Sequence, residues 1–236
     1  MNPVTELSRH PRRRGFLNDD AFSETVSRPI HLLRIDASPR ASKSNSMALT
    51  DAFVTARTDA LPSVTVDVMN VWDEKLPEFD NAAIDAKYKG VAGSTMNEAE
   101  TGVWNRIHTL VAPFKRADRI VLGVPMWNFA YPYKLKQLIN LVSQRNMLFT
   151  YDGERFGPLL QTPKAMVIHT RCQEYKEDLP TPPSRFDHQS RYVEFWLDFI
   201  GVQQVRALAV ENTWGDKAEA SMQAAREKVA ALALDF

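Results

Sequence analysis

Residues 38–46 combine hydroxyl groups with positive charge. This stretch contains four serines, Arg40 and Lys43, and it directly precedes an apolar pattern at helical spacing over 45–60. The first amide groups of a helix have no carbonyl partner in the helix, and they lie at the positive end of its dipole. Serine donors at this position favour an anion site, and the lack of glycine excludes the two common glycine-rich nucleotide loops. The alternative is a helix cap with surface serines. The serines are Ser38, Ser42, Ser44 and Ser46.

A second stretch, residues 124–133, is unusually rich in flat apolar side chains for a loop. It reads VPMWNFAYPY, with four aromatic residues and two prolines, and it follows the apolar run RIVLGV. Trp127 and Phe129 would form an apolar wall for a planar ring, and the backbone of residues 126–129 would bond the polar edge of that ring. Interfaces use the same residue types, so packing on a partner subunit or on the adjacent helix is an equal alternative.

The third stretch follows another apolar run and reads HTRCQEYKEDLPTPPSRF. Its prolines at 180–183 predict a long excursion over the surface, such as a lid. Cys172, the single cysteine of the chain, is a conceivable nucleophile at a strand exit. However, the sequence shows no histidine with an acidic or amide partner to activate the thiol, and small buried thiols are common.

Alternating strands and helices must position these three stretches. Apolar runs predict strands over 30–36, 64–70, 119–124, 165–170 and 205–210. Amphipathic patterns predict helices over 45–60, 97–117, 134–145, 189–201 and 216–234, the last capped by Asp216, while 71–94 reads as irregular. Five alternations indicate an α/β fold, with a flavodoxin-like five-stranded parallel sheet in the order 2-1-3-4-5 and helices on both faces. Such sheets bind ligands at the carboxyl ends of their strands, where all three stretches lie.

The amino-acid composition narrows the class of protein. Lys plus Arg (29) balances Asp plus Glu (29), which gives no reason to expect nucleic acid as a partner. One cysteine and five scattered histidines exclude a disulfide framework and give no metal signature. No apolar run approaches the ~20 residues of a membrane span, and the first thirty residues lack the apolar core of a secretory signal. We therefore expect a cytoplasmic protein with one domain over 30–236. Residues 1–29 read as an extension, either a flexible arm, a partner contact or an organellar transit peptide.

From Ile30 to the last helix, the chain resembles a known family. The loop PMWNF, the following LK and LINLV, then FTY, GPLL and FWLDFIGV, are similar to motifs of the FMN-dependent NADH:quinone oxidoreductases, the azoreductase family of the flavodoxin-like fold. One segment departs from the pattern: Cys172 and Gln173 stand where the family has the two glycines of an S-R-G-G sequence. Glycine at such positions permits close backbone approach and positive φ.

The resemblance implies a role for individual residues. It implies that the serine loop holds the FMN phosphate, that the aromatic loop lines the isoalloxazine largely through its backbone, and that the third loop lies beside the ring. An aromatic residue of the FTY motif would lie on the substrate side. These residues are Ser38, Ser42, Lys43 and Ser44 for the phosphate; Met126, Trp127, Asn128 and Phe129, with Thr170, Arg171, Cys172 and Gln173, for the ring; and Tyr151 for the substrate.

The resemblance also implies an activity. NADH or NADPH would deliver hydride to the flavin N5, and a quinone or azo compound would then take the electrons in a ping-pong cycle without a side-chain nucleophile. The family's homodimers place both sites at the subunit interface. The altered Thr-Arg-Cys-Gln segment keeps a second interpretation open, an FMN-binding electron carrier with little NAD(P)H turnover, although the neutral charge balance disfavours it. A hydrolase using serine or Cys172 is a third, and the missing triad disfavours it.

Overall fold

The computed structural model describes residues 29–236. Apart from Pro29, the extension predicted over 1–29 lies outside the described residues. Within the described part of the chain, no helix is long and apolar enough to cross a membrane.

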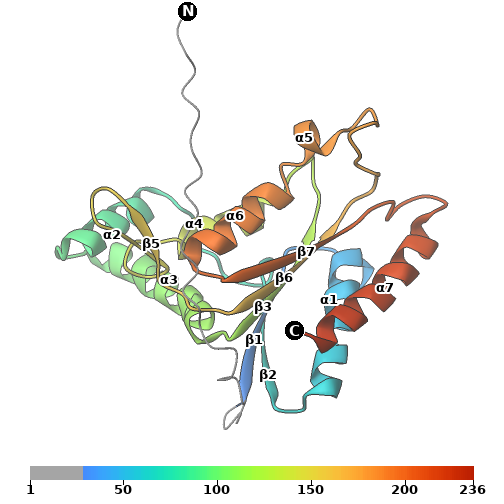
Figure 1. Cartoon of the computed structure of the whole chain (residues 1–236). Helices are drawn as coiled ribbons and strands as arrows, with labels where there is room; N and C mark the ends of the chain where they lie inside the picture. Colours follow the sequence, from blue (N-terminus) through green and yellow to red (C-terminus); the bar gives the residue numbers. More distant parts are fainter. Residues whose placement is uncertain (1–28) are drawn as a thin grey trace, which may run out of the picture.

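One sheet of five parallel strands organises the molecule (Figure 1). Its order is β2-β1-β3-β6-β7, which confirms the predicted order 2-1-3-4-5. The strands are β1 (Ile30–Asp36), β2 (Val64–Asn70), β3 (Arg119–Pro125), β6 (Lys164–Thr170) and β7 (Gln204–Val210). The first strand of the described chain is therefore internal, and its two neighbours both come later in the sequence.

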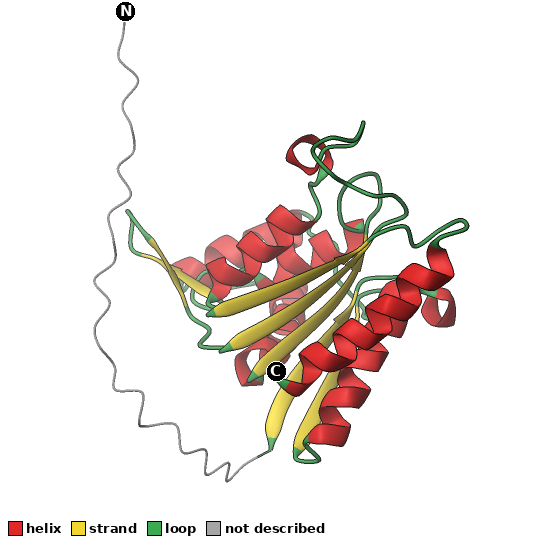
Figure 2. Cartoon of the chain, turned by 45° about the vertical axis from the view of Figure 1, so that its right-hand side comes forward, coloured by secondary structure: helices red, strands yellow, loops and turns green. Residues whose placement is uncertain are grey.

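Helices cover both faces of the sheet, as expected (Figures 1 and 2). One face carries α1 (Asn45–Ala60) and α7 (Ala218–Leu234), which pack on each other. The other carries α3 (Glu98–Arg116), α4 (Tyr133–Val142) and α6 (Ser190–Ile200). Gly201, in a left-handed conformation with φ 112°, ends α6 where the sequence predicts a glycine cap.

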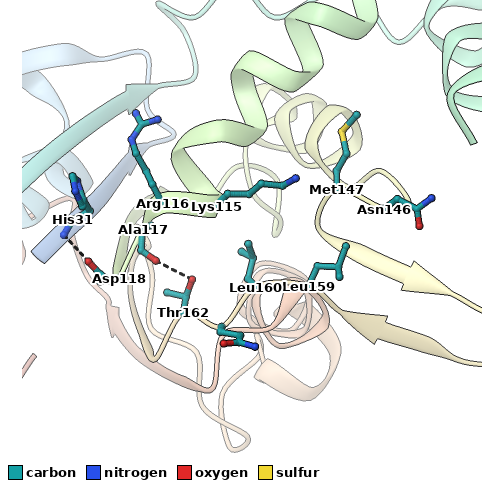
Figure 3. A pocket seen from close by; sticks show the side chains of 11 residues that line it. His31, Lys115, Arg116, Ala117, Asp118, Asn146, Met147, Leu159, Leu160 and Thr162 are labelled. Atoms are coloured by element: carbon teal, nitrogen blue, oxygen red, sulfur yellow. Dashed lines mark hydrogen bonds between the residues drawn. The ribbon is translucent and has the colours of Figure 1, made fainter.

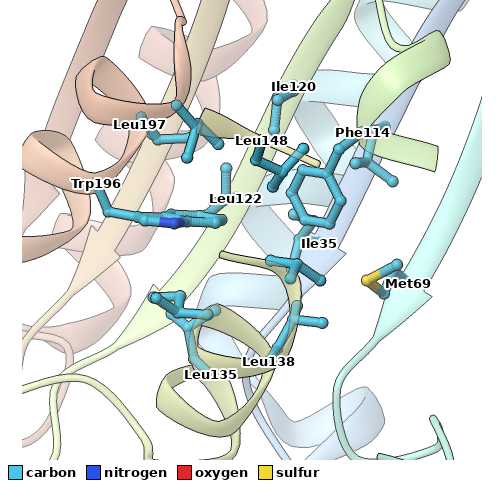
Figure 4. Packing of buried hydrophobic residues seen from close by; sticks show 14 of the residues in the cluster. Ile35, Met69, Phe114, Ile120, Leu122, Leu135, Leu138, Leu148, Trp196 and Leu197 are labelled. Carbon is cyan, nitrogen blue, oxygen red and sulfur yellow. The ribbon is translucent and has the colours of Figure 1, made fainter. Parts of the chain in front are cut away.

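Each face of the sheet contributes to its own apolar core. Ile120 and Leu122 of β3 point into the core beneath α3, α4 and α6, whereas Val121 points into the core beneath α1 and α7. Figure 4 shows the first of these cores, where Phe114 and Trp196 pack edge to face at 5.9 Å. Burial on both faces explains why the central strands β3 and β6 read as continuous apolar runs.

Two local predictions were wrong, and one element was missed. The segment 71–94 contains a helix, α2 (Asn81–Ala92), capped by Asp80 and ended by Gly93 at φ 67°. Its buried positions are alanines, so it has no strong apolar stripe, and it packs on α3 rather than on the sheet. A short antiparallel hairpin, β4 (Phe149–Tyr151) with β5 (Phe156–Pro158), was not predicted. Asp216 does not cap α7, which begins at Ala218 without a side-chain cap.

Candidate functional site

The carboxyl edge of the sheet brings the three predicted loops together. The amide of Ala37 donates to the Gly123 carbonyl at 3.0 Å, which joins the first loop to β3. The amide of Met126 donates to the Thr170 carbonyl at 2.8 Å, which joins the aromatic loop to the third. These bonds place the strand ends side by side, so the loops surround one region as the fold class predicts.

The start of α1 offers free donors at this edge. Ser44 is the N-cap, and its hydroxyl accepts a hydrogen bond from the amide of Met47 at 3.3 Å. The amides of Asn45 and Ser46, in the first turn, donate to no group among the described residues. Unpaired amides at the positive end of a helix dipole are groups of the kind that bind anions.

The rest of the serine loop wraps in front of those amides. Ser38 is buried, and its hydroxyl accepts from the Arg40 amide at 3.3 Å. Ser42 and Lys43 lie on a single exposed turn of 3-10 helix, η1 (Ala41–Lys43). The loop thus presents a hydroxyl and an ammonium to solvent, whereas its other serines also have structural roles.

The aromatic loop is a tight turn with an uncommon backbone. Trp127 and Ala130 exchange amide-to-carbonyl hydrogen bonds of 2.8 and 2.9 Å. Between them, Asn128 and Phe129 have φ values of 47° and 69°, the pattern of a type I′ turn. Phenylalanine in the left-handed region costs about 1–2 kcal/mol, and such strain is concentrated at ligand sites. Phe129 is 41% exposed, so the turn holds an apolar ring at the surface.

The Arg171 side chain lies beneath these loops rather than in solvent. It is 4% exposed, and its guanidinium donates to Asp187 at 2.6 Å and to Gln189 at 3.0 Å. Glu211 lies 3.5 Å from it. Burial alone would raise the pKa of the Asp187 carboxyl, but hydrogen bonds from Ser190 and the charge of Arg171 outweigh burial and hold that pKa below its usual range. Arg171 is therefore the charged centre of a buried network.

This network extends to the aromatic loop. The Gln189 side-chain amide donates to the Val124 carbonyl at 2.8 Å, and the His188 amide donates to the Phe129 carbonyl at 3.0 Å. A short helix, α5 (Pro183–Phe186), follows the proline tract, and the Phe186 ring lies 5.1 Å from that of Phe129. The excursion predicted from the prolines thus returns to the aromatic loop and supports it.

Trp72 is a site residue that the sequence patterns do not predict. Its indole N–H donates to the Ala37 carbonyl at 3.0 Å, and its ring lies 5.7 Å from Trp127 and 5.3 Å from Tyr133. It therefore connects the serine loop with the aromatic loop. The sequence feature that could have identified Trp72 is its position just after β2, because that strand ends at the same edge of the sheet as the other loops.

The remaining predicted residues differ in their placement. Cys172 and Gln173 are exposed beside Arg171, and neither has positive φ, so both fit where the family pattern has glycine. Tyr151 lies on the β4–β5 hairpin, stacked on Phe156 at 4.6 Å, and in residues 29–236 no hydrogen bond or ring contact links it to the three loops. Figures 1 and 2 both show the hairpin on the side of the molecule away from α5.

A further hollow lies away from the three loops. About 850 Å³ in volume, it lies at the amino edge of the sheet, between His31, the end of α3 and Thr162 (Figure 3). Lys115 and Arg116, in the last turn of α3, line it together with Asp118, and none of its lining residues belongs to the three loops. A phosphate that lies close to the aromatic loop is therefore better supported at the start of α1.

Comparison with known proteins agrees with the fold. A family model described as having a flavodoxin-like fold matches residues 31–233. The chain is 53% identical over 207 residues to FMN-dependent NADH:quinone oxidoreductase 2 of Burkholderia lata, covering 88% of this chain and 100% of that one. It is 39% identical over 205 residues to FMN-dependent NADH:quinone oxidoreductase 3 of Pseudomonas fluorescens, covering 86% and 95%. The crystal structure of an azoreductase from Bacillus anthracis superposes with a TM-score of 0.80 at 26% identity, covering 88% and 100%. The chain belongs to the flavodoxin-like family of FMN-dependent NADH:quinone oxidoreductases and azoreductases.

Proposed function

We propose that residues 30–236 form an FMN-binding domain that catalyses electron transfer from NADH to quinones, with azo compounds as further acceptors. The observation that carries this proposal is the 53% identity that spans the whole length of a relative named for that activity. The three loops at the carboxyl edge support it independently, because they combine an anion site with an apolar surface. We include NADPH as a second donor.

The loops fit the two ends of FMN. The free amides of Asn45 and Ser46, with Ser38, Ser42, Lys43 and Ser44, would hold the phosphate. Gly123 lets α1 approach the sheet there, because a side-chain carbon at 123 would meet the Ser46 carbonyl oxygen at 3.1 Å. The loops 126–129 and 170–173 would border the isoalloxazine ring.

FMN held by these loops would supply the two-electron chemistry by which a hydride from NADH and a proton convert a quinone to a hydroquinone. The protein's own part is to bind and to orient. The type I′ turn fixes the aromatic wall, and the network around Arg171 holds that turn in place. In this proposal no side chain forms a covalent bond to the substrate. Because NADH is an intracellular donor, the proposal implies the cytoplasmic location expected from the sequence.

The visible spectrum of the purified protein tests the proposal. We expect flavin absorption that is near-stoichiometric with the chain, bleached by NADH without oxygen and restored by menadione. Protein that is colourless and cannot be loaded with FMN would rule out any flavin function. Bound flavin that NADH fails to reduce would instead favour the electron carrier motivated by the Thr-Arg-Cys-Gln segment.

A charge change at Ser42 tests the phosphate site. Ser42→Glu should raise the Kd for FMN by about tenfold or more, because a carboxylate within several ångströms of a phosphate repels it. Ser63→Glu is the matched control, since it adds the same charge just before β2, at the opposite edge. Fluorescence titration of flavin-free protein with FMN gives both values. Equal FMN affinity in the two variants would place the phosphate elsewhere.

We also propose a homodimer, as the family resemblance implies. A cluster of rings covers the hairpin and the outer face of α6, and Phe156 and Phe195 are 63% and 60% exposed. Exposed aromatic clusters are typical of subunit interfaces. A second copy would also account for the position of Tyr151, which would serve the partner's site.

Substitution within that cluster tests the dimer. Phe156→Glu should convert a dimer into a monomer in sedimentation velocity, because it places a charge in an apolar interface. Phe156 is exposed in the single chain, so the fold should survive the change. A dimer of unchanged affinity in the variant would exclude this surface as the interface.

A further inference from the structure

A fourth loop follows a strand at the carboxyl edge of the sheet, and none of its residues has been assigned to FMN. It covers residues 211–217 between β7 and α7, with the sequence ENTWGDK (Figure 1). Thr170 and Val210 are partners in the parallel register, so β7 ends beside β6. This loop, which we call the Trp214 loop, is therefore a neighbour of the third loop.

Hydrogen bonds fix the Trp214 loop to two of the proposed FMN loops. The amide and the hydroxyl of Thr213 both donate to the Arg171 carbonyl, at 3.0 and 2.9 Å. The Asn45 side-chain amide donates to the Thr213 carbonyl at 3.1 Å. Asn45 is in the first turn of α1, where we propose that the phosphate binds. The Trp214 loop is therefore held against both the phosphate site and the segment proposed to border the flavin ring.

The Trp214 side chain is free at this fixed position. It is 79% exposed, more than any other large apolar side chain that the structure describes. Within residues 29–236, its ring contacts no other ring or cation, and its indole N–H donates no hydrogen bond. Single exposed apolar residues are common on protein surfaces. This one, however, lies between two left-handed residues, Asn212 at φ 54° and Gly215 at φ 82°, on a loop that the bonds of Thr213 hold in place.

The charges of the loop indicate which kind of ligand the indole suits. Asp216 and Lys217 directly follow Gly215, both are exposed, and their charges cancel. Glu211, at the start of the loop, lies 3.5 Å from Arg171. The loop therefore has no excess positive charge with which to attract a phosphate or a carboxylate. A neutral planar ring is the better match, because a nucleobase stacked on an aromatic side chain gains about 1–3 kcal/mol.

We propose that Trp214 stacks on the adenine of NADH and thereby determines the affinity for the adenylate half of the donor. The inference rests on the proposed function, because it assumes that the nicotinamide reaches a flavin ring bordered by residues 170–173. The Trp214 loop bonds directly to that segment through Arg171. The adenine takes no part in hydride transfer, so stacking there adds binding energy at a distance from the reacting atoms.

The test compares NADH with reduced nicotinamide mononucleotide, which lacks the adenylate half, on full-length protein loaded with FMN. Trp214→Ala should lower kcat/KM for NADH about five- to tenfold, the loss of one stacked base, and leave kcat/KM for the mononucleotide unchanged. The Kd for ADP-ribose, measured by calorimetry, should rise by the same factor. Trp214→Phe should recover part of both losses, because a smaller ring still stacks.

Tyr88→Ala is the matched control, because it removes an aromatic ring that is 66% exposed on α2, away from the carboxyl-edge loops. It should change none of these values. The inference is overturned if Trp214→Ala leaves the Kd for ADP-ribose unchanged, if it lowers kcat/KM equally for both donors, or if Tyr88→Ala has the same effects. If neither donor reduces the unmodified protein, the proposed function has failed, and the Kd values for ADP-ribose then decide separately whether Trp214 binds adenine.

Discussion

Replacing Arg171 by methionine is expected to lower the free energy of unfolding by about 3–5 kcal/mol, the usual effect of removing one partner from a buried ion pair. Methionine fills a similar volume, so loss of packing contributes little. The effect comes from Asp187, which is 8% exposed and would keep its negative charge without its cation. Because Gln189 and His188 hold the aromatic loop, the same variant should retain FMN less tightly.

Urea unfolding of flavin-free protein, followed by circular dichroism, measures this loss. The double variant Arg171→Met with Asp187→Asn should recover part of it, because the stranded charge is then gone. Arg226→Met, at an exposed arginine of α7, should change stability by less than about 0.5 kcal/mol. A loss below about 1 kcal/mol for Arg171→Met would mean that water replaces the guanidinium, contrary to the buried network.

Gly201→Ala should destabilise the protein by about 2–5 kcal/mol, through two effects acting together. Gly201 has φ 112°, a conformation that alanine rarely adopts. In addition, the new methyl carbon would lie 2.1 Å from the Leu160 carbonyl oxygen. That oxygen belongs to backbone fixed by a hydrogen bond from the Leu160 amide to the Ile200 carbonyl at 3.0 Å, so it has little freedom to move.

Gly93→Ala separates the two effects. Gly93 also has positive φ, at 67°, but an added methyl carbon there meets nothing within 4 Å. This variant should therefore show the conformational cost alone, about 1–2 kcal/mol. The difference between the two losses in unfolding free energy from urea measures the clash with Leu160 together with the greater backbone strain at φ 112°. Equal losses would show that the chain around Leu160 relaxes freely.

The sheet was predictable from the sequence because its central strands, β1, β3 and β6, are buried on both faces. A continuous apolar run such as RIVLGV, with helical patterns on either side of it, is typical of a central strand in a parallel sheet. The sequence does not reveal elements that bury little apolar surface, because they show no clear apolar pattern. The inward residues of α2 are Ala83 and Ala86, and the strands of the β4–β5 hairpin have three residues each.

The sequence predicted where the candidate site lies in the fold. It predicted the roles of the individual residues less well. Fold class alone placed the serine and aromatic loops at one edge, because parallel strands end together. The partners of Arg171 could not be read from the sequence, since Asp187 and Glu211 are brought to it only by folding. A charged residue at a strand exit looks like a ligand contact until its neighbours are known. Trp72 was missed because the segment after β2 shows no clear apolar periodicity.

The internal position of β1 has a consequence for synthesis on the ribosome. Of the described elements, β1 is the first to emerge, yet its second neighbour, β3, follows far later: the His31 amide bonds to Asp118, 87 residues further along the chain. At translation rates of about 5–20 residues per second, one edge of β1 waits roughly 4–17 s for its partner. During that time the nascent chain presents an unpaired apolar strand, which is the kind of segment that chaperones bind. The carboxyl edge, and with it the whole site, can assemble only near the end of translation.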